Sequence, residues 1–182
     1  CRSEIINYIK NNRTMKSAEG ISIPDFIKQE SLQNTASLKN NATIHNSLCQ
    51  IFGGTNFRFC SHNDIGINRV VGWHKDKLNN KYAKFETVNI WGNYGNEKHE
   101  IVKVLIYLQD HADGKEGLKV VPGSHLTKNI DKRGHVQLKT NVGDVIIFDQ
   151  RITHRGMEKT WTDKSNPRIL VSFGFGKNNI FT

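Results

Sequence analysis

The spacing of apolar positions divides the chain into a helical first third and a strand-rich remainder. Apolar residues recur three and four positions apart within residues 4–10 and again within residues 42–52. Between these two segments, Pro24 is suited to open a further helix, because proline is tolerated in the first turn. We therefore predict a helical N-terminal part over residues 1–53.

Beyond this part the apolar pattern shortens to runs rich in Val, Ile, Phe and Tyr, each bounded by Gly, Asn or Asp. Candidate strands follow one another without intervening helices, at residues 56–60, 67–73, 85–91, 101–108, 118–121, 135–139, 145–148 and 168–176. This order argues against a doubly wound parallel sheet. It predicts a mainly β sandwich or jelly roll with the N-terminal helices packed on one side. We expect a single domain over residues 1–182, with the β core at 54–182.

Composition excludes several classes of protein. The chain has 182 residues, of which 36% are hydrophobic and 24% charged, values typical of a globular protein. No apolar run approaches the roughly 20 residues that cross a bilayer, and no secretory signal or C-x-x-C pair is visible. We therefore expect a cytoplasmic protein with no membrane partner, whose three cysteines stay reduced.

The charge balance favours anionic partners. The chain carries 26 Lys and Arg against 17 Asp and Glu, a net charge of +9. Because these basic residues are spread along the whole chain, a solvated positive surface explains them better than a dedicated nucleic-acid face does. We therefore expect a small-molecule ligand and no nucleic acid, and the pattern carries no signal for an oligomeric state.

Three H-x-D tripeptides are candidate metal sites, at His62-Asn63-Asp64, His74-Lys75-Asp76 and His111-Ala112-Asp113. On a strand, residues i and i+2 point to the same face, so an imidazole and a carboxylate can bind one ion. The tripeptide at His74 follows an apolar run and is the best placed of the three. We expect the first to form a hairpin turn between strands and the third a loop and turn.

A further ligand and a cation complete the candidate site. His154 follows the buried strand at 145–148, and two imidazoles with one carboxylate suit non-haem Fe(II). A hydrogen-bonded structural role is the alternative for this histidine. Arg168 opens the apolar run at 168–176, where it could bind a dicarboxylic cosubstrate or pair with one of the nearby acidic residues, Asp144, Asp149 and Glu158.

The ordered motifs GWHKD, YLQD, GLKVVPGSH, GDVIIFDQRITHRG and PRILVSFGFG resemble those of the phytanoyl-CoA dioxygenase-like (PhyH) family of Fe(II)/2-oxoglutarate oxygenases, across residues 55–176. The resemblance implies a double-stranded β-helix in which His74, Asp76 and His154 hold Fe(II). It also implies that Arg168 and Trp91 bind 2-oxoglutarate, that O2 is consumed, and that His125 is structural. In relatives a hydroxyl residue often follows the distal histidine by two, where this chain has Gly156.

The activity implied by this resemblance is hydroxylation of a small metabolite. Its substrate is left open. Lys75, Lys77, Lys81 and Lys84 either form a solvated loop or attract an anionic substrate to the cavity mouth. Two alternatives also stay open: an oxidative nucleic-acid demethylase of the same fold, and a non-catalytic jelly-roll binding module.

Overall fold

The computed structural model describes residues 1–12, 15–17, 20–76, 93–94, 97–98, 100–156 and 165–178. Its α-helices are α1 (Arg2–Asn11), α2 (Gln33–Ala36) and α3 (Ala42–Phe52), with short 3-10 turns η1 (Phe26–Lys28), η2 (Glu30–Leu32), η3 (Ser37–Asn40) and η5 (Ser124–Leu126). Its strands are β1 (Met15–Ser17), β2 (Gly20–Pro24), β3 (Phe57–Ile67), β4 (Asn93–Tyr94), β5 (Glu97–Lys98), β6 (Ile101–Tyr107), β7 (Lys119–Val120), β8 (Val136–Gln137), β9 (Val145–Asp149), β10 (His154–Arg155) and β11 (Ile169–Lys177).

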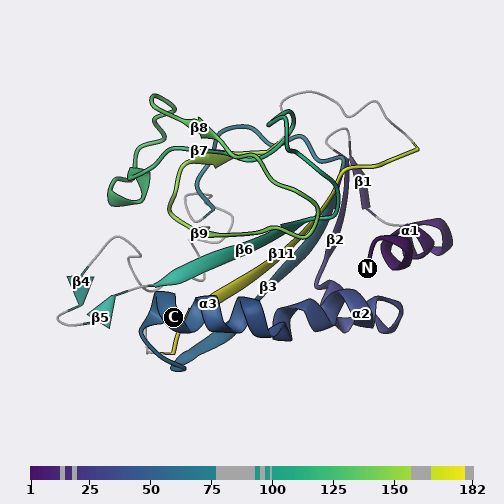
Figure 1. Ribbon diagram of the computed structural model, residues 1–182, viewed down its shortest axis with the longest axis horizontal. Helices are drawn as coiled ribbons and strands as arrows, with labels where there is room; N and C mark the ends of the chain where they lie inside the picture. The colour runs from purple at the N-terminus through teal and green to yellow at the C-terminus, as the bar shows by residue number, and fades with distance from the viewer. Residues whose placement is uncertain are drawn as a thin grey trace.

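Two antiparallel sheets form the body of the protein (Figure 1). The larger sheet has the order β1-β2-β3-β11-β6-β9, so its central strand β11 pairs with β3 and β6, which are distant from it in sequence. The smaller sheet has the order β10-β7-β8 and lies above the larger one in Figure 1. The described residues thus confirm a mainly antiparallel β fold with helices on one side.

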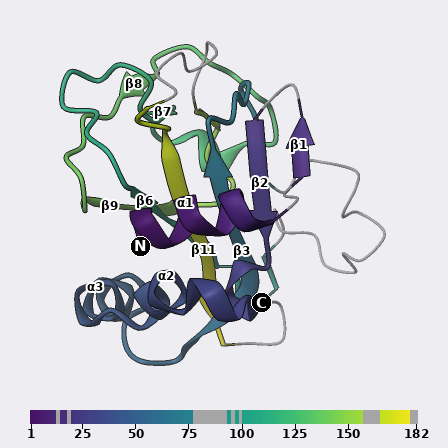
Figure 2. The same ribbon diagram turned by 90° about the vertical axis from the view of Figure 1, so that its right-hand side faces the viewer.

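The two faces of the larger sheet carry different cores, because side chains alternate along each strand. Val104, Ile106, Val171 and Phe173 point to the helix-covered face, where they pack with the apolar residues Ile5, Phe26, Leu32, Ile44 and Leu48. Figure 2 shows α1 lying across the strands on this side, with α2 and α3 below it. The opposite face carries Leu105 and Tyr107, which pack with Leu118 and Phe148 of the second core.

Helix α3 matches its sequence prediction closely. The side chain of Asn41 accepts hydrogen bonds from the backbone N–H groups of Thr43 and Ile44, which caps the N-terminus. Gly53 ends the helix with φ 72, a left-handed conformation that glycine adopts at little cost. The cap and the terminating glycine therefore fix both ends of the helix.

Three local predictions were wrong. Pro24 ends strand β2 and does not open a helix, and β2 adds to the larger sheet, so the first third is not wholly helical. His62 and Asp64 lie within the long strand β3 and not in a hairpin turn. The predicted strand at 67–73 is irregular after Ile67, because Asn68 takes a positive φ of 52 that ends β3. The predicted strand at 85–91 lies outside the described residues.

Among the described residues, no helix is long and apolar enough to span a bilayer.

Candidate metal centre

The segment that follows β3 brings the second H-x-D tripeptide to the cavity. The backbone N–H of Asn68 donates to the carbonyl of Arg168, and the N–H of Arg168 donates to the side-chain oxygen of Asn68. Beyond this anchor, His74 and His154 exchange two backbone hydrogen bonds of 2.9 Å each. Two ligand candidates eighty positions apart in the chain are therefore held together by main-chain pairing.

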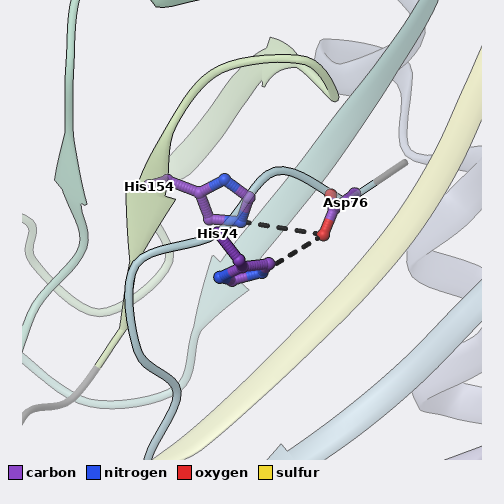
Figure 3. A group of neighbouring side chains, drawn as sticks. All are labelled: His74, Asp76 and His154. Carbon is purple, nitrogen blue, oxygen red and sulfur yellow. Dashed lines mark ion pairs between the residues drawn. The ribbon is translucent and has the colours of Figure 1, made fainter. Parts of the chain in front are cut away.

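The side chains of His74, Asp76 and His154 converge on one point (Figure 3). The Oδ1 atom of Asp76 lies 3.4 Å from Nε2 of His74 and 3.8 Å from Nε2 of His154. One potential ligand atom from each residue lies within 4.8 Å of the other two, so the group could hold a metal ion. It is the one such cluster of three or more in the part of the chain that the structure describes.

Backbone carbonyls fix the orientation of both imidazoles. Nδ1 of His74 lies 2.9 Å from the carbonyl oxygen of Gly72, and Nδ1 of His154 lies 2.8 Å from that of Ile152. Because a carbonyl can only accept, each Nδ1 carries the proton and each Nε2 is left with a lone pair. Both lone pairs are on the nitrogens nearest Asp76, as metal binding requires.

The electrostatics of the cluster also suit a cation. Burial opposes ionisation of Asp76, but the positive charge of Lys103 is the largest of the effects that hold the pKa of the carboxyl well below its usual range. Burial lowers the pKa of His154 to about 4, although Asp76 opposes this effect. The ligand atoms are thus an anionic oxygen and a neutral imidazole nitrogen at neutral pH, the forms that bind metals.

One oxygen of the cluster has no partner in the part of the chain that the structure describes. The Oδ2 atom of Asp76 is buried and accepts no hydrogen bond there, whereas Oδ1 lies 3.1 Å from Nζ of Lys103. Leaving a buried carboxylate oxygen without a donor costs free energy. The unmet acceptor and the two aligned imidazoles fit a divalent metal ion of the kind that takes two histidines and one carboxylate.

Arg168, the cation predicted for the site, is buried and lines the cavity that also contains the three ligand candidates. Arg168 is 2% exposed, and its Nε donates to the carbonyl of Glu116 while Nη2 donates to the hydroxyl of Tyr107, both at 2.9 Å. A guanidinium has five N–H groups, and the two hydrogen bonds given above leave three of them without an acceptor among the described residues. Neither Asp144 nor Asp149 pairs with this arginine, and Glu158 lies outside the described residues. Asp149 pairs with Arg151 instead.

Tyr107 is a functional candidate that the sequence analysis missed. Its ring lies under the guanidinium of Arg168, with 4.8 Å between the ring centre and Cζ. Burial raises the pKa of Tyr107, although Arg168 opposes this effect, so the hydroxyl keeps its proton. Because its oxygen accepts from Arg168 and its proton has no described acceptor, the O–H can donate into the cavity. The alternation of residues 103, 105 and 107 on β6 was the available signal.

A buried network behind Arg168 holds this end of the site in place. The side-chain oxygen of Gln109 accepts from the backbone N–H of Ile169, and its amide nitrogen lies 2.9 Å from Nε2 of His111. Nδ1 of His111 in turn lies 2.8 Å from the carbonyl oxygen of Lys115. These contacts tie the loop that presents Glu116 to the first residue of β11, next to Arg168.

The other sequence candidates have different environments. Asp64 accepts from Ser22 and Arg69, which uses both its carboxylate oxygens. Asp113 lies in the expected turn and accepts from the backbone N–H of Lys115. His125 lies in η5 and is not a member of the His74, Asp76 and His154 group. Trp91, Lys77, Lys81 and Lys84 lie outside the described residues.

Lys75 differs from its sequence interpretation. We expected it in a lysine-rich loop that is either solvated or exposed to an anionic substrate, but its side chain is buried. Its Nζ donates to the carbonyls of Ser124 and Arg151, at 2.5 and 2.6 Å. It stands between His74 and Asp76 in the chain. Lys75 therefore anchors the segment that carries both ligand candidates.

One cavity joins the two ends of the site. It has a volume of about 810 Å³ and is lined by the metal cluster, by Lys103, Tyr107 and Arg168, and by Gly156. A Cβ placed on Gly156 would lie 3.7 Å from Nη2 of Arg168. The missing hydroxyl side chain at this position thus leaves open space beside the guanidinium.

Comparisons with known proteins establish the fold. No protein-family model matches the chain, and no curated protein matches it. Among solved structures, HygX from Streptomyces hygroscopicus, crystallised with nickel, 2-oxoglutarate and hygromycin B, aligns with a TM-score of 0.65 and 16% identity over 96% of this chain and 77% of HygX.

Two further solved structures align equally well. EctD from S. alaskensis, with 2-oxoglutarate and 5-hydroxyectoine, gives a TM-score of 0.66 and 18% identity over 96% of this chain and 66% of EctD. The non-haem α-ketoglutarate-dependent epimerase SnoN gives 0.67 and 16% over 96% of this chain and 70% of SnoN. The chain therefore has the fold of these three proteins.

Proposed function

We propose that this protein is a non-haem Fe(II)/2-oxoglutarate-dependent dioxygenase that hydroxylates a small metabolite. One observation carries the proposal: a single cavity holds a His-Asp-His group at one end and, at the other, a buried arginine with no carboxylate partner among the described residues. A buried guanidinium without a counter-ion is costly, so its site is built for an anion that arrives from outside. A metal ligand group and a separate anion site together suit a chelating dicarboxylate.

The spacing along β6 supports a cosubstrate between the two ends. Lys103, Leu105 and Tyr107 face the cavity from alternate positions of the strand. Four residues of strand span about 13 Å. Lys103 contacts Asp76 of the metal cluster, and Tyr107 contacts Arg168. An extended dicarboxylate therefore has room to lie along β6 with one end at the metal and the other at Arg168.

Each residue has a distinct task in this proposal. His74, Asp76 and His154 hold Fe(II), while Arg168 and the Tyr107 hydroxyl bind the distal carboxylate of 2-oxoglutarate. When bound, Fe(II) and 2-oxoglutarate supply oxidation by O2, in which 2-oxoglutarate becomes succinate and CO2 and the substrate gains one oxygen atom. The protein needs no nucleophile of its own, and its residues bind and orient the reactants.

The proposal also includes a reaction type, hydroxylation, and membership of the PhyH-like family. The motif resemblance supports that family, a double-stranded β-helix, a role of Trp91 in the cosubstrate pocket, and a single domain with its core at residues 54–182. Asp76 supports hydroxylation over halogenation, because a carboxylate ligand takes the position that a halide needs. The epimerase SnoN shares this fold, so the fold does not identify the reaction, which has to be measured.

The three cysteines form no disulfide, which supports a cytoplasmic location.

The test is anaerobic titration of the protein with Fe(II) and 2-oxoglutarate. We expect a weak visible charge-transfer band, followed in air by slow succinate release. His154→Ala and Arg168→Met should each abolish or strongly weaken the band, because they remove a metal ligand and the counter-ion of the cosubstrate.

Asp113→Asn is the matched control, since it removes the carboxylate of another H-x-D tripeptide and should leave the band intact. A His154→Ala band equal to that of the unmodified protein would refute the metal assignment. A band without any succinate release would favour the binding module. Succinate release stimulated by methylated DNA or RNA, and not by metabolites, would favour the demethylase.

A further inference from the structure

A hollow in the cavity floor lies next to the metal cluster. Gly174 of β11 pairs with Lys103 of β6, so both face the cavity, while Phe173 and Phe175 face the helices. A Cβ on Gly174 would lie 3.1 Å from Cβ of His62 and 3.7 Å from Nε2 of Gln150. The position of Gly174 is therefore tightly packed, and the hollow is the part of the cavity lined by His62, Lys103 and Gln150.

Gln150 brings an unmet hydrogen-bonding group to this hollow. It is 5% exposed and lines the cavity, yet its side-chain oxygen has no partner among the residues that the structure describes. Its backbone is fixed beside the metal cluster, because its carbonyl accepts from the N–H of Asp76 and its N–H donates to the carbonyl of Ile101. A buried acceptor without a donor is costly. The carboxamide is thus poised for a hydroxyl or amine from a ligand.

Lys103 brings a positive charge to the same hollow. Its side chain is 14% exposed, and within the described ranges Asp76 is its one ion-pair partner. In the function proposed above, the charge of Asp76 is shared with a divalent metal, so the ammonium loses most of its compensation. A second anion next to Lys103 would restore the balance, because an uncompensated buried charge is strongly unfavourable.

We infer that this hollow binds the primary substrate, and that Lys103 and Gln150 determine its class. The substrate is a small molecule with a carboxylate or phosphate for Lys103 and a neighbouring hydroxyl or amine for Gln150. The cavity that these two side chains line provides the space for the molecule. The inference rests on the proposed function, since it concerns the substrate of the same metal site.

The experiment measures the binding of four small probes to the anaerobic protein loaded with Fe(II) and 2-oxoglutarate. Glycerate and glycerol 3-phosphate carry both an anion and hydroxyls, propionate carries only the anion, and glycerol carries only hydroxyls. Binding is followed as a change in the charge-transfer band, and in parallel as a shift in melting temperature with nickel in place of iron. We expect one of the two hydroxylated anions to bind at least tenfold more tightly than propionate and glycerol.

Variants identify the residues. Lys103→Met should weaken binding of that probe at least tenfold, and Gln150→Leu should weaken it while leaving propionate unchanged. Gly174→Ala should weaken it, because the added methyl group presses on His62 and lies against Gln150. Lys139→Met removes one positive charge from an exposed residue outside the cavity and is the matched control. Each dissociation constant is measured with enough 2-oxoglutarate to saturate that variant.

The outcomes separate this inference from the proposed function. If Fe(II) and 2-oxoglutarate give no band, the proposed function fails before any probe is added. If the band forms but glycerol binds as tightly as the anions, or none of the four probes binds, the inference is overturned. Equal losses in Lys103→Met and Lys139→Met would overturn it as well. Tighter binding of glycerate identifies a carboxylate, and tighter binding of glycerol 3-phosphate a phosphate.

Discussion

The two faces of the larger sheet use the same strands for different purposes. On β11, Phe173 points into the helix-covered core, while its neighbour Ser172 lines the cavity and donates to the carbonyl of Asp64. On β6, Val104 is core and Lys103 contacts the metal cluster. Alternation thus separates stability from chemistry within single strands. Substitutions on one face should therefore spare the other.

The largest expected effect is on the helix-covered face. Phe173→Ala should lower the free energy of unfolding by about 3–5 kcal/mol, because it leaves a cavity among buried aromatic rings. Ser172→Ala, the matched change one position away, should cost only about 1 kcal/mol, the usual value of one hydrogen bond. Denaturant unfolding of both variants measures this difference. Equal losses would contradict the division between the faces.

Removing a proposed metal ligand on the cavity side should weaken metal binding, whereas a change in the helix-covered core should not. Asp76→Asn should weaken divalent metal binding by more than about 100-fold, since even indirect partners of metal ligands contribute 10–100-fold. Calorimetric titration with nickel measures the affinity. Phe173→Ala, studied under conditions in which it is folded, should bind nickel within about twofold of the unmodified protein. A comparable loss of affinity in that variant would show that the faces are coupled.

A smaller effect is expected at the anion end of the cavity. Tyr107→Phe should weaken 2-oxoglutarate binding about tenfold, because it removes one donor to the distal carboxylate. Binding of 2-oxopentanoate, which ends in a methyl group, should not change. The two dissociation constants are read from the charge-transfer band. If both ligands weaken equally, Tyr107 supports the fold of the pocket and does not contact the carboxylate.

The smallest effect concerns pH. Burial lowers the pKa of His111, with Arg168 adding to the effect, whereas the Lys115 carbonyl, Asp113 and Glu116 oppose it. Between this lowered pKa and the unfolded value of about 6.5, the unfolded state binds the extra proton, so stability falls as pH falls below about 6.5. The slope from this one group is at most about 1.4 kcal/mol per pH unit. His111→Gln should flatten the dependence between pH 5 and 7, as measured by urea unfolding.

Much of the fold could be predicted, because the apolar pattern of a strand or helix and the residues that end a helix involve positions close together in the sequence. The strand at 101–108 was predicted from its apolar run, and α3 from its helical spacing and terminating glycines. Strand β3 was divided in two because its cavity face is polar, so that His62 and Asp64 looked like turn residues. β2 was missed because a proline at its end favoured a helix.

Only part of the site could be predicted, because a sequence pattern assigns a role to some of its residues and not to others. His74, Asp76 and His154 were selected by spacing and motif order, and the structure brings them together. Their role as ligands stays a prediction. Tyr107 and Gln150 lie within quoted motifs that assign them no role, and Lys103 lies outside these motifs. Their place in the site becomes visible only when the structure puts them beside the cavity. Lys75 was misjudged because a lysine is normally solvated, whereas two carbonyls hold this one.

The paired backbone bonds between His74 and His154 affect how the protein acquires its metal. Since folding itself closes the eighty-residue separation, an incoming ion meets donors that are already arranged and need not organise the chain around itself. Chelation should then empty the centre without unfolding the protein, and reloading should be rapid. Which ion occupies the centre would follow the supply in the cell, because folding does not select among similar divalent metals.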